Sequence, residues 1–230
     1  MAKRRRKDKL KDETLVDVVE VKESAQDFFE QNKTLVFSII GGLILIVGSF
    51  LFYKIAFKDP NEKNAKLAIY KAEQQFARDS FALALENPGG GFEGFLDIID
   101  NYSGTSSANL ASLYAGISYL NLGRFDDAIS YLDNHSANSI YSKIMKNGAL
   151  GDSYSELGDI DKALSFYEKA TTAGDDALLT PYYLYKLGLL AQINGDTTKA
   201  LAAYKKIKEN YADSNEGSGI DRLIAKVSNS

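Results

Sequence analysis

The sequence predicts an all-α protein, in which a single transmembrane helix precedes an α-solenoid of about three helical-hairpin repeats and capping helices. Two observations carry this prediction: a long run without charge near the N-terminus, and three segments with glycine and alanine at the same spacing. The 230 residues are enough for one anchor and one modest domain. Cysteine is absent, which excludes disulfides, thiol catalysis and thiolate metal sites.

The uncharged run lies between Lys33 and Lys54 and reads TLVFSIIGGLILIVGSFLFY. As a helix its 20 residues would extend about 30 Å, which matches the hydrocarbon thickness of a bilayer. We expect an uncleaved signal-anchor over residues 34–57, because about 33 residues precede the run and no good cleavage site follows it. A buried core helix and a cleaved signal peptide are the alternatives.

Small residues within this run fall on roughly one face of the expected helix. Small side chains let helices approach closely in lipid, so the face is a candidate for packing against another membrane helix. Glycine is frequent in membrane spans in any case, so both interpretations stay open. The residues of this transmembrane packing face are Ser38, Gly41, Gly42, Gly48 and Ser49.

Charge is distributed unevenly along the chain. The N-terminal tail is basic and includes Arg4, Arg5 and Arg6, and positive flanks stay in the cytoplasm. We therefore predict a single-pass protein of the inner (cytoplasmic) membrane, with a cytoplasmic N-terminus and a periplasmic repeat domain. From Lys54 onward 18 basic side chains face 23 acidic ones, and this acidic balance argues against a nucleic-acid partner.

Three segments of the chain align without gaps over their diagnostic part. In each, a second glycine follows the first after seven residues and an alanine follows five later, with offsets of 35 and 37 residues between segments. We expect the first glycine to allow two helices to cross closely and the second to end a helix in the left-handed conformation. The alanine would lie at the tightest contact. These structural positions are Gly116, Gly123, Ala128, Gly151, Gly158, Ala163, Gly188, Gly195 and Ala200.

Further helices are expected from Asn61 to Leu85, from Phe92 to Tyr102 and from Ile220 to Val227, with a break at the proline and three glycines after Asn87. An amphipathic helix is expected from Thr14 to Gln31. The predicted division of the chain is 1–33 cytoplasmic basic tail with amphipathic helix, 34–57 transmembrane helix, 58–107 linker helix and degenerate N-terminal hairpin, 108–212 three repeats, and 213–230 closing helix and tail.

No group of residues indicates catalysis. Gly89, Gly90 and Gly91 lack the Gly-Lys-Ser/Thr that a phosphate loop needs. The single histidine, His135, lies just past a predicted helix, where we expect a solvated or capping role. We therefore predict no enzyme activity, no catalytic residue, no metal site and no cofactor. An enzyme with an undetected site is the alternative.

The repeated glycines and alanines, with Tyr119 and Tyr154, resemble the tetratricopeptide repeat, although the usual early aromatic residue and late proline are missing. The resemblance covers about Asn109 to Asn210 and implies a partner-binding groove lined by the first helix of each hairpin. The lysine-and-asparagine pattern that clamps a terminal carboxylate in some members is not visible. Carried over by register, the groove residues are Leu113, Ile117, Leu120, Asp152, Ser155, Tyr182, Tyr185, Leu189 and Gln192.

The whole arrangement, with runs such as LALENPGGGFEGF, resembles the ancillary subunit family of the SecYEG translocon (YfgM-like, Bacteroidota type). This resemblance implies docking of a PpiD-type membrane-anchored chaperone beside SecYEG and assistance to exported client proteins. Composition and periodicity alone indicate only a protein-binding scaffold anchored in the lipid bilayer. A tetratricopeptide scaffold for envelope assembly or cell division is the alternative.

Overall fold

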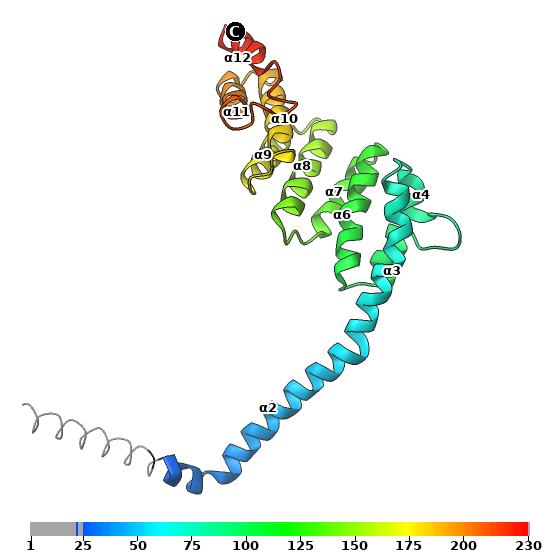
Figure 1. Ribbon diagram of the computed structural model, residues 1–230, viewed down its shortest axis with the longest axis vertical. Helices are drawn as coiled ribbons and strands as arrows, with labels where there is room; N and C mark the ends of the chain where they lie inside the picture. Colours follow the sequence, from blue (N-terminus) through cyan, green and yellow to red (C-terminus); the bar gives the residue numbers. More distant parts are fainter. Residues whose placement is uncertain (1–21, 23–24, 230) are drawn as a thin grey trace, which may run out of the picture. The chain divides into compact units, whose positions relative to one another are not determined.

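The computed structural model describes residue 22 and residues 25–229, and every regular element within them is helical (Figure 1). The prediction of an all-α fold is confirmed. Two units divide the chain, Met1–Asp59 and Pro60–Ser230, and each is described by itself. The basic residues of the predicted tail lie outside the described residues, as does most of the helix expected from Thr14 to Gln31; residues 25–31 are helical.

The first unit contains α2 (Lys33–Tyr53), which covers the uncharged run, and η1 (Lys54–Lys58), one turn of π-helix. The large apolar side chains of α2 are exposed, with 72% of Leu45 and 68% of Ile46 accessible. Among the described residues, one helix is long and apolar enough to cross a membrane, and it contains this run. A surface of this composition is unfavourable in water and suits hydrocarbon.

The second unit starts with three helices that pack against one end of the repeat array. They are α3 (Asp59–Phe76), α4 (Phe81–Glu86) and α5 (Phe95–Asn101). The single helix expected from Asn61 to Leu85 is wrong, because the backbone turns after Phe76 and Asp79 adopts a φ of 56°. The turn brings Phe76 and Phe81 into edge-to-face contact, with ring centroids 5.5 Å apart.

Three helix pairs follow in chain order and stack one after another, from green to orange in Figure 1. Apolar side chains between successive pairs form the core, and α12 (Ile220–Ser228) packs on the last pair through Ile220 and Val227. The pairs are α6 (Ser106–Asn121) with α7 (Phe125–Asn134), α8 (Ile140–Glu156) with α9 (Ile160–Thr172), and α10 (Leu179–Ile193) with α11 (Thr197–Asn210).

Each pair turns sharply between its two helices. After α8, Gly158 adopts a φ of +77°, a left-handed conformation that costs glycine least, and Gly123 and Gly195 occupy the same position in the other pairs. The next helix begins at once, because the side chain of Asp159 accepts a hydrogen bond from the backbone N–H of Lys162 at 3.2 Å. The side chain of Asp196 caps α11 in the same way.

Close approach between the helices of a pair occurs at the glycines in the middle of each first helix. A Cβ placed on Gly116 would lie 2.5 Å from the side chain of Leu132, and one on Gly151 would lie 2.6 Å from the ring of Tyr167. At Gly188 the corresponding distance to the Tyr204 ring is 2.4 Å. Three alanines of the second helices are fully buried at these crossings: Ala128, Ala163 and Ala200.

Candidate protein-binding groove

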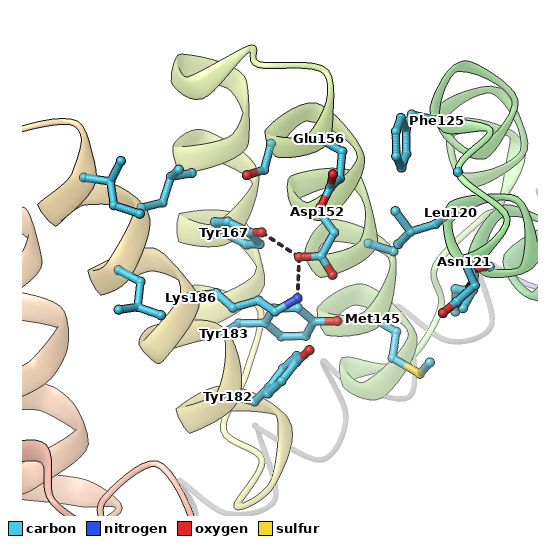
Figure 2. Close-up of a pocket in the computed structure, with 17 residues that line it drawn as sticks. Leu120, Asn121, Phe125, Met145, Asp152, Glu156, Tyr167, Tyr182, Tyr183 and Lys186 are labelled. Atoms are coloured by element: carbon cyan, nitrogen blue, oxygen red, sulfur yellow. Dashed lines mark hydrogen bonds and ion pairs between the residues drawn. The ribbon is translucent and has the colours of Figure 1, made fainter.

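A groove with a volume of about 730 Å³ crosses the repeat array, and Figure 2 shows its lining side chains. The first helices of the three pairs, α6, α8 and α10, supply most of the walls. The lining residues are Ile117, Leu120, Asn121, Gly123, Phe125, Met145, Ala149, Asp152, Ser155, Glu156, Tyr167, Tyr182, Tyr183, Lys186, Leu189, Leu190 and Ile193.

The structure brings most of the residues predicted for the groove together. Those that line it are Ile117, Leu120, Asp152, Ser155, Tyr182 and Leu189. The other three, Leu113, Tyr185 and Gln192, lie elsewhere. Leu113 is 2% exposed and packs in the core between the first two repeats. Tyr185 and Gln192 face the tyrosine of α11, Tyr204, whose hydroxyl donates to Gln192 Oε1 at 3.3 Å.

Tyr185 and Gln192 lie outside the groove for a geometric reason. Each directly precedes a groove residue, Lys186 or Ile193, and one residue rotates a helix by about 100°. A spacing of four residues from Tyr182 would have identified Lys186 as a lining residue. Tyr167 gave no such signal, because it belongs to α9, a second helix, and reaches the groove across Gly151.

A polar group lies in the middle of this groove, between aliphatic and aromatic side chains. The hydroxyl of Tyr167 donates to Asp152 Oδ1 at 2.5 Å, and Lys186 Nζ pairs with the same oxygen at 2.7 Å. Both interactions appear as dashed lines that meet on one oxygen in Figure 2. The side chains of Asp152 and Lys186 are 18% and 29% exposed, so this ion pair joins the second repeat to the third in a partly desolvated setting.

Burial and the negative charge of Asp152 together shift the pKa values in this group. Burial raises the pKa of the Tyr167 and Tyr183 phenols well above the ordinary value, and the negative charge of Asp152 raises both further. Burial alone would lower the pKa of Lys186, but attraction to Asp152 and hydrogen bonds to Asp152 and Tyr182 outweigh it, so that pKa is raised. At neutral pH the two phenols are therefore uncharged and the ammonium is charged.

Two family models for the tetratricopeptide repeat match the chain, one at residues 149–215 and one at residues 110–134. The chain contains tetratricopeptide repeats. The matched segments include the glycine and alanine positions of all three helix pairs. No curated protein sequence matches the chain. Tetratricopeptide arrays are typically non-enzymatic scaffolds that bind other proteins on an extended surface, so the groove is a candidate for protein binding.

Aromatic and aliphatic side chains at the edge of the tetratricopeptide groove are open to solvent. Tyr182 is 40% exposed and Ile193 is 82% exposed. The Lys186 ammonium lies 4.8 Å from the centre of the Tyr182 ring, and that ring meets Tyr183 edge to face at 4.9 Å. Because these contacts already restrict the rings, a partner can bury their apolar area with little further loss of side-chain entropy.

The only histidine lies outside the tetratricopeptide groove, at the end of α7. His135 is 4% exposed, and its Nδ1 lies 2.8 Å from the carbonyl oxygen of Asn109. Burial lowers its pKa, so the ring is neutral at pH 7. Of the two roles expected for His135, the solvated one is wrong, because the ring is packed where the first two repeats meet. The capping role is confirmed: His135 is the C-cap residue of α7, and its backbone N–H donates to the Leu132 carbonyl oxygen at 3.1 Å. Lys146 Nζ donates to the His135 carbonyl at 2.8 Å. Its Nε2 is buried without a hydrogen-bond partner in the described residues.

The predicted transmembrane packing face lies on α2. A Cβ added to Gly41, Gly42 or Gly48 would meet no atom within 4 Å in the described part of the chain. Ser38 Oγ donates to the carbonyl oxygen of Thr34 at 2.7 Å, which satisfies its hydroxyl within the helix, and Ser49 is exposed. No described residue therefore fills the space in front of the three glycines of this face. Among the described residues, no group of three histidine or acidic side chains is placed to hold a metal ion.

Proposed function

We propose that the chain is a membrane-anchored, non-enzymatic scaffold that binds a protein segment in its tetratricopeptide groove. The observation that carries this proposal is the groove itself, which crosses three repeats and exposes apolar and aromatic side chains around a fixed Asp152–Lys186 ion pair. A concave surface that combines exposed apolar side chains with a few fixed polar groups is typical of a binding site. A held polar pair among apolar walls can fix the orientation of what binds.

We further propose that the scaffold is an accessory subunit of the Sec translocon, which docks a PpiD-type chaperone and assists exported client proteins. The exposed apolar surface of α2 supports anchoring in the inner membrane. The basic residues at the start of the sequence support a cytoplasmic N-terminus and a periplasmic repeat domain, since positive flanks stay inside. The sequence resemblance to the ancillary translocon subunits supports the choice of partners.

The small residues of α2, with Gly41 and Gly42 at the centre, are proposed to contact SecYEG within the bilayer. Their backbone is open to close approach, because nothing in the described residues fills the space where a Cβ would stand. The groove would then recognise the chaperone or its clients. This division gives two surfaces that can be altered separately.

Co-purification of the full-length chain from gently solubilised membranes tests the proposal. Combined Tyr182→Ala and Leu189→Ala substitution removes two groove side chains, and we expect it to lose the chaperone while retaining SecYEG. Tyr70→Ala is the matched control, because Tyr70 is 58% exposed on α3 and does not line the groove. Combined Gly41→Leu and Gly42→Leu substitution is expected to lose SecYEG.

Recovery of envelope-assembly or cell-division proteins without SecY would favour that other scaffold role and contradict the translocon proposal. Equal recovery of every partner with the groove variant and the control would place recognition outside the groove. A reporter fused to the C-terminus tests orientation independently. Reporter activity confined to the cytoplasm would contradict the proposed topology.

A further inference from the structure

The charges inside the groove are unbalanced. Its lining includes two carboxylates, Asp152 and Glu156, against one ammonium, Lys186. Lys186 and Tyr167 both bind the same oxygen of Asp152, Oδ1. Among the described residues no hydrogen bond to Asp152 Oδ2 and no ion pair of Glu156 is seen, and Glu156 is exposed. The groove thus keeps acceptor capacity and one net negative charge.

These two carboxylates share one face of α8. Asp152 and Glu156 are four residues apart, which places them one above the other on the helix. Apolar walls stand on both sides: Ile117 and Leu120 on α6, and Leu189 and Ile193 on α10. A ligand that covers these walls also covers the carboxylates, so an uncompensated negative charge would be desolvated unless the ligand supplies a cation.

We propose that the groove selects a protein segment in which a lysine or arginine is flanked by apolar side chains. This inference rests on the proposed function of the groove as a protein-binding site. The cation pairs with Asp152 Oδ2 and Glu156, and its aliphatic stem lies against the apolar walls. An acidic segment meets repulsion from both carboxylates, and Lys186 is already engaged by Asp152 and Tyr182.

The aromatic rings of the groove also favour a partner that carries a lysine or arginine. Phe125 and Tyr182 both line the groove, and aromatic faces attract lysine and arginine. A simple inorganic cation would leave the apolar walls open to water. A peptide carrying one cation between apolar residues satisfies both the walls and the carboxylates.

Fluorescence polarisation with the full-length chain in lipid nanodiscs tests the inference. The probes are three labelled peptides with the same leucine, phenylalanine and alanine positions and a central lysine, norleucine or glutamate. We expect the lysine peptide to bind roughly tenfold more tightly than the glutamate peptide, with norleucine between them. High salt should reduce this preference, because screening weakens exposed ion pairs.

Variants identify the groups responsible. Glu156→Gln alone, and together with Asp152→Asn, should reduce the preference for lysine stepwise. Lys186→Gln removes the competing ammonium and should strengthen binding of the lysine peptide. Glu209→Gln is the matched control, since it removes the same charge at an exposed position of α11 that does not line the groove, and it should change nothing. Glu156 is exposed, so its variant keeps the test valid even where Asp152→Asn unfolds.

The outcomes separate two kinds of failure. Equal affinity for the three peptides would overturn the charge selectivity while binding in the groove stands. A lysine preference that survives removal of both carboxylates would also overturn it. If no peptide binds, and Tyr182→Ala leaves partner recovery unchanged, the proposed function of the groove fails, and the selectivity with it.

Discussion

Glycines occur in the middle of helices in both units of the chain, but their surroundings differ completely. In the repeats, the place where a Cβ would stand is already filled: Tyr183 occupies it at Gly148, with its ring carbon 1.9 Å away, and Tyr204 occupies it at Gly188. In α2, Gly41 and Gly42 have no atom within 4 Å of that place. The same residue type therefore completes a contact in one unit and leaves a contact open in the other.

This difference separates two uses of a small residue. In the repeat array the absence of a side chain lets a neighbouring helix of the same chain approach, and the contact contributes to folding. In α2 any gain from close approach has to come from lipid or from another protein. Substitutions at the two sets of glycines should therefore affect different measurements.

The largest effect is expected at Gly148. Gly148→Ala places a methyl carbon 1.9 Å from a ring carbon of Tyr183, so the buried ring or the helices that hold it must shift. We expect a loss of about 3 kcal/mol in the free energy of unfolding. Chemical denaturation of the full-length chain, followed by circular dichroism, measures it. Gly42→Ala is the matched control and should leave the transition of the repeats unchanged. A Gly148→Ala variant as stable as the parent would show that the contact with Tyr183 yields easily.

Alkaline pH should reduce the stability of the repeats through their buried tyrosines, and Tyr204 gives a defined test. Burial, and then the charge of Tyr185, raise the pKa of Tyr204 to about 12 from the ordinary value of 10.0. Above pH 10 the unfolded chain loses this phenol proton and the folded chain keeps it, so the free energy of unfolding falls as pH rises from 10 to 12. The slope is at most about 1.4 kcal/mol per pH unit for one tyrosine.

Below pH 10 this contribution to stability is complete, so Tyr204 adds no slope to the pH dependence there. Tyr204→Phe should reduce the slope above pH 10, measured by denaturant titrations at successive pH values. Parallel pH profiles for the parent and Tyr204→Phe would contradict the assignment.

A smaller effect is expected at the turns. Gly158→Ala forces a side chain into a left-handed backbone with a φ of +77°, which costs about 1 kcal/mol. No atom lies within 4 Å of the added Cβ, so backbone strain alone accounts for the loss. Thermal unfolding compares it with Gly48→Ala in α2, where φ is not positive and no loss is expected. Equal melting temperatures for both variants would exclude strain at this turn.

The smallest effect on folding is expected from Gly41→Leu in α2. The added side chain meets nothing in the described residues, so the unfolding transition of the repeats should not move. Recovery of SecYEG in co-purification should fall, if the face packs as proposed. If the variant recovers as much SecYEG as the parent chain does, this face does not pack against SecYEG.

The repeat architecture was predictable because its signal is periodic. Glycine and alanine at fixed spacing imply helices that cross closely, and the structure has helix pairs at those positions. The contact of Tyr183 with Gly148 gave no such signal, because it joins neighbouring repeats at positions that do not recur. The turn at Asp79 was missed because a non-glycine residue takes the left-handed conformation there, which aspartate tolerates better than most.

To predict the groove residues one must know how each helix is rotated about its own axis, and sequence spacing gives this rotation only approximately. Tyr182 and Leu189 lie on the groove face, whereas Tyr185 is rotated toward α11. The buried position of His135 depends on Asn109, 26 residues earlier, and no local pattern reports such a contact. Local spacing therefore predicts which surface a helix offers, and tertiary packing decides which of its residues remain open.

The final helix has a consequence for how long this array can be. α12 places Ile220 and Val227 over the third repeat, at 4% exposure each, and α11 is thereby covered on the side where a fourth hairpin would stack. A further hairpin could stack on α11 in that position only if α12 were displaced. The groove is therefore confined to the three pairs that precede α12, and its walls come mainly from α6, α8 and α10.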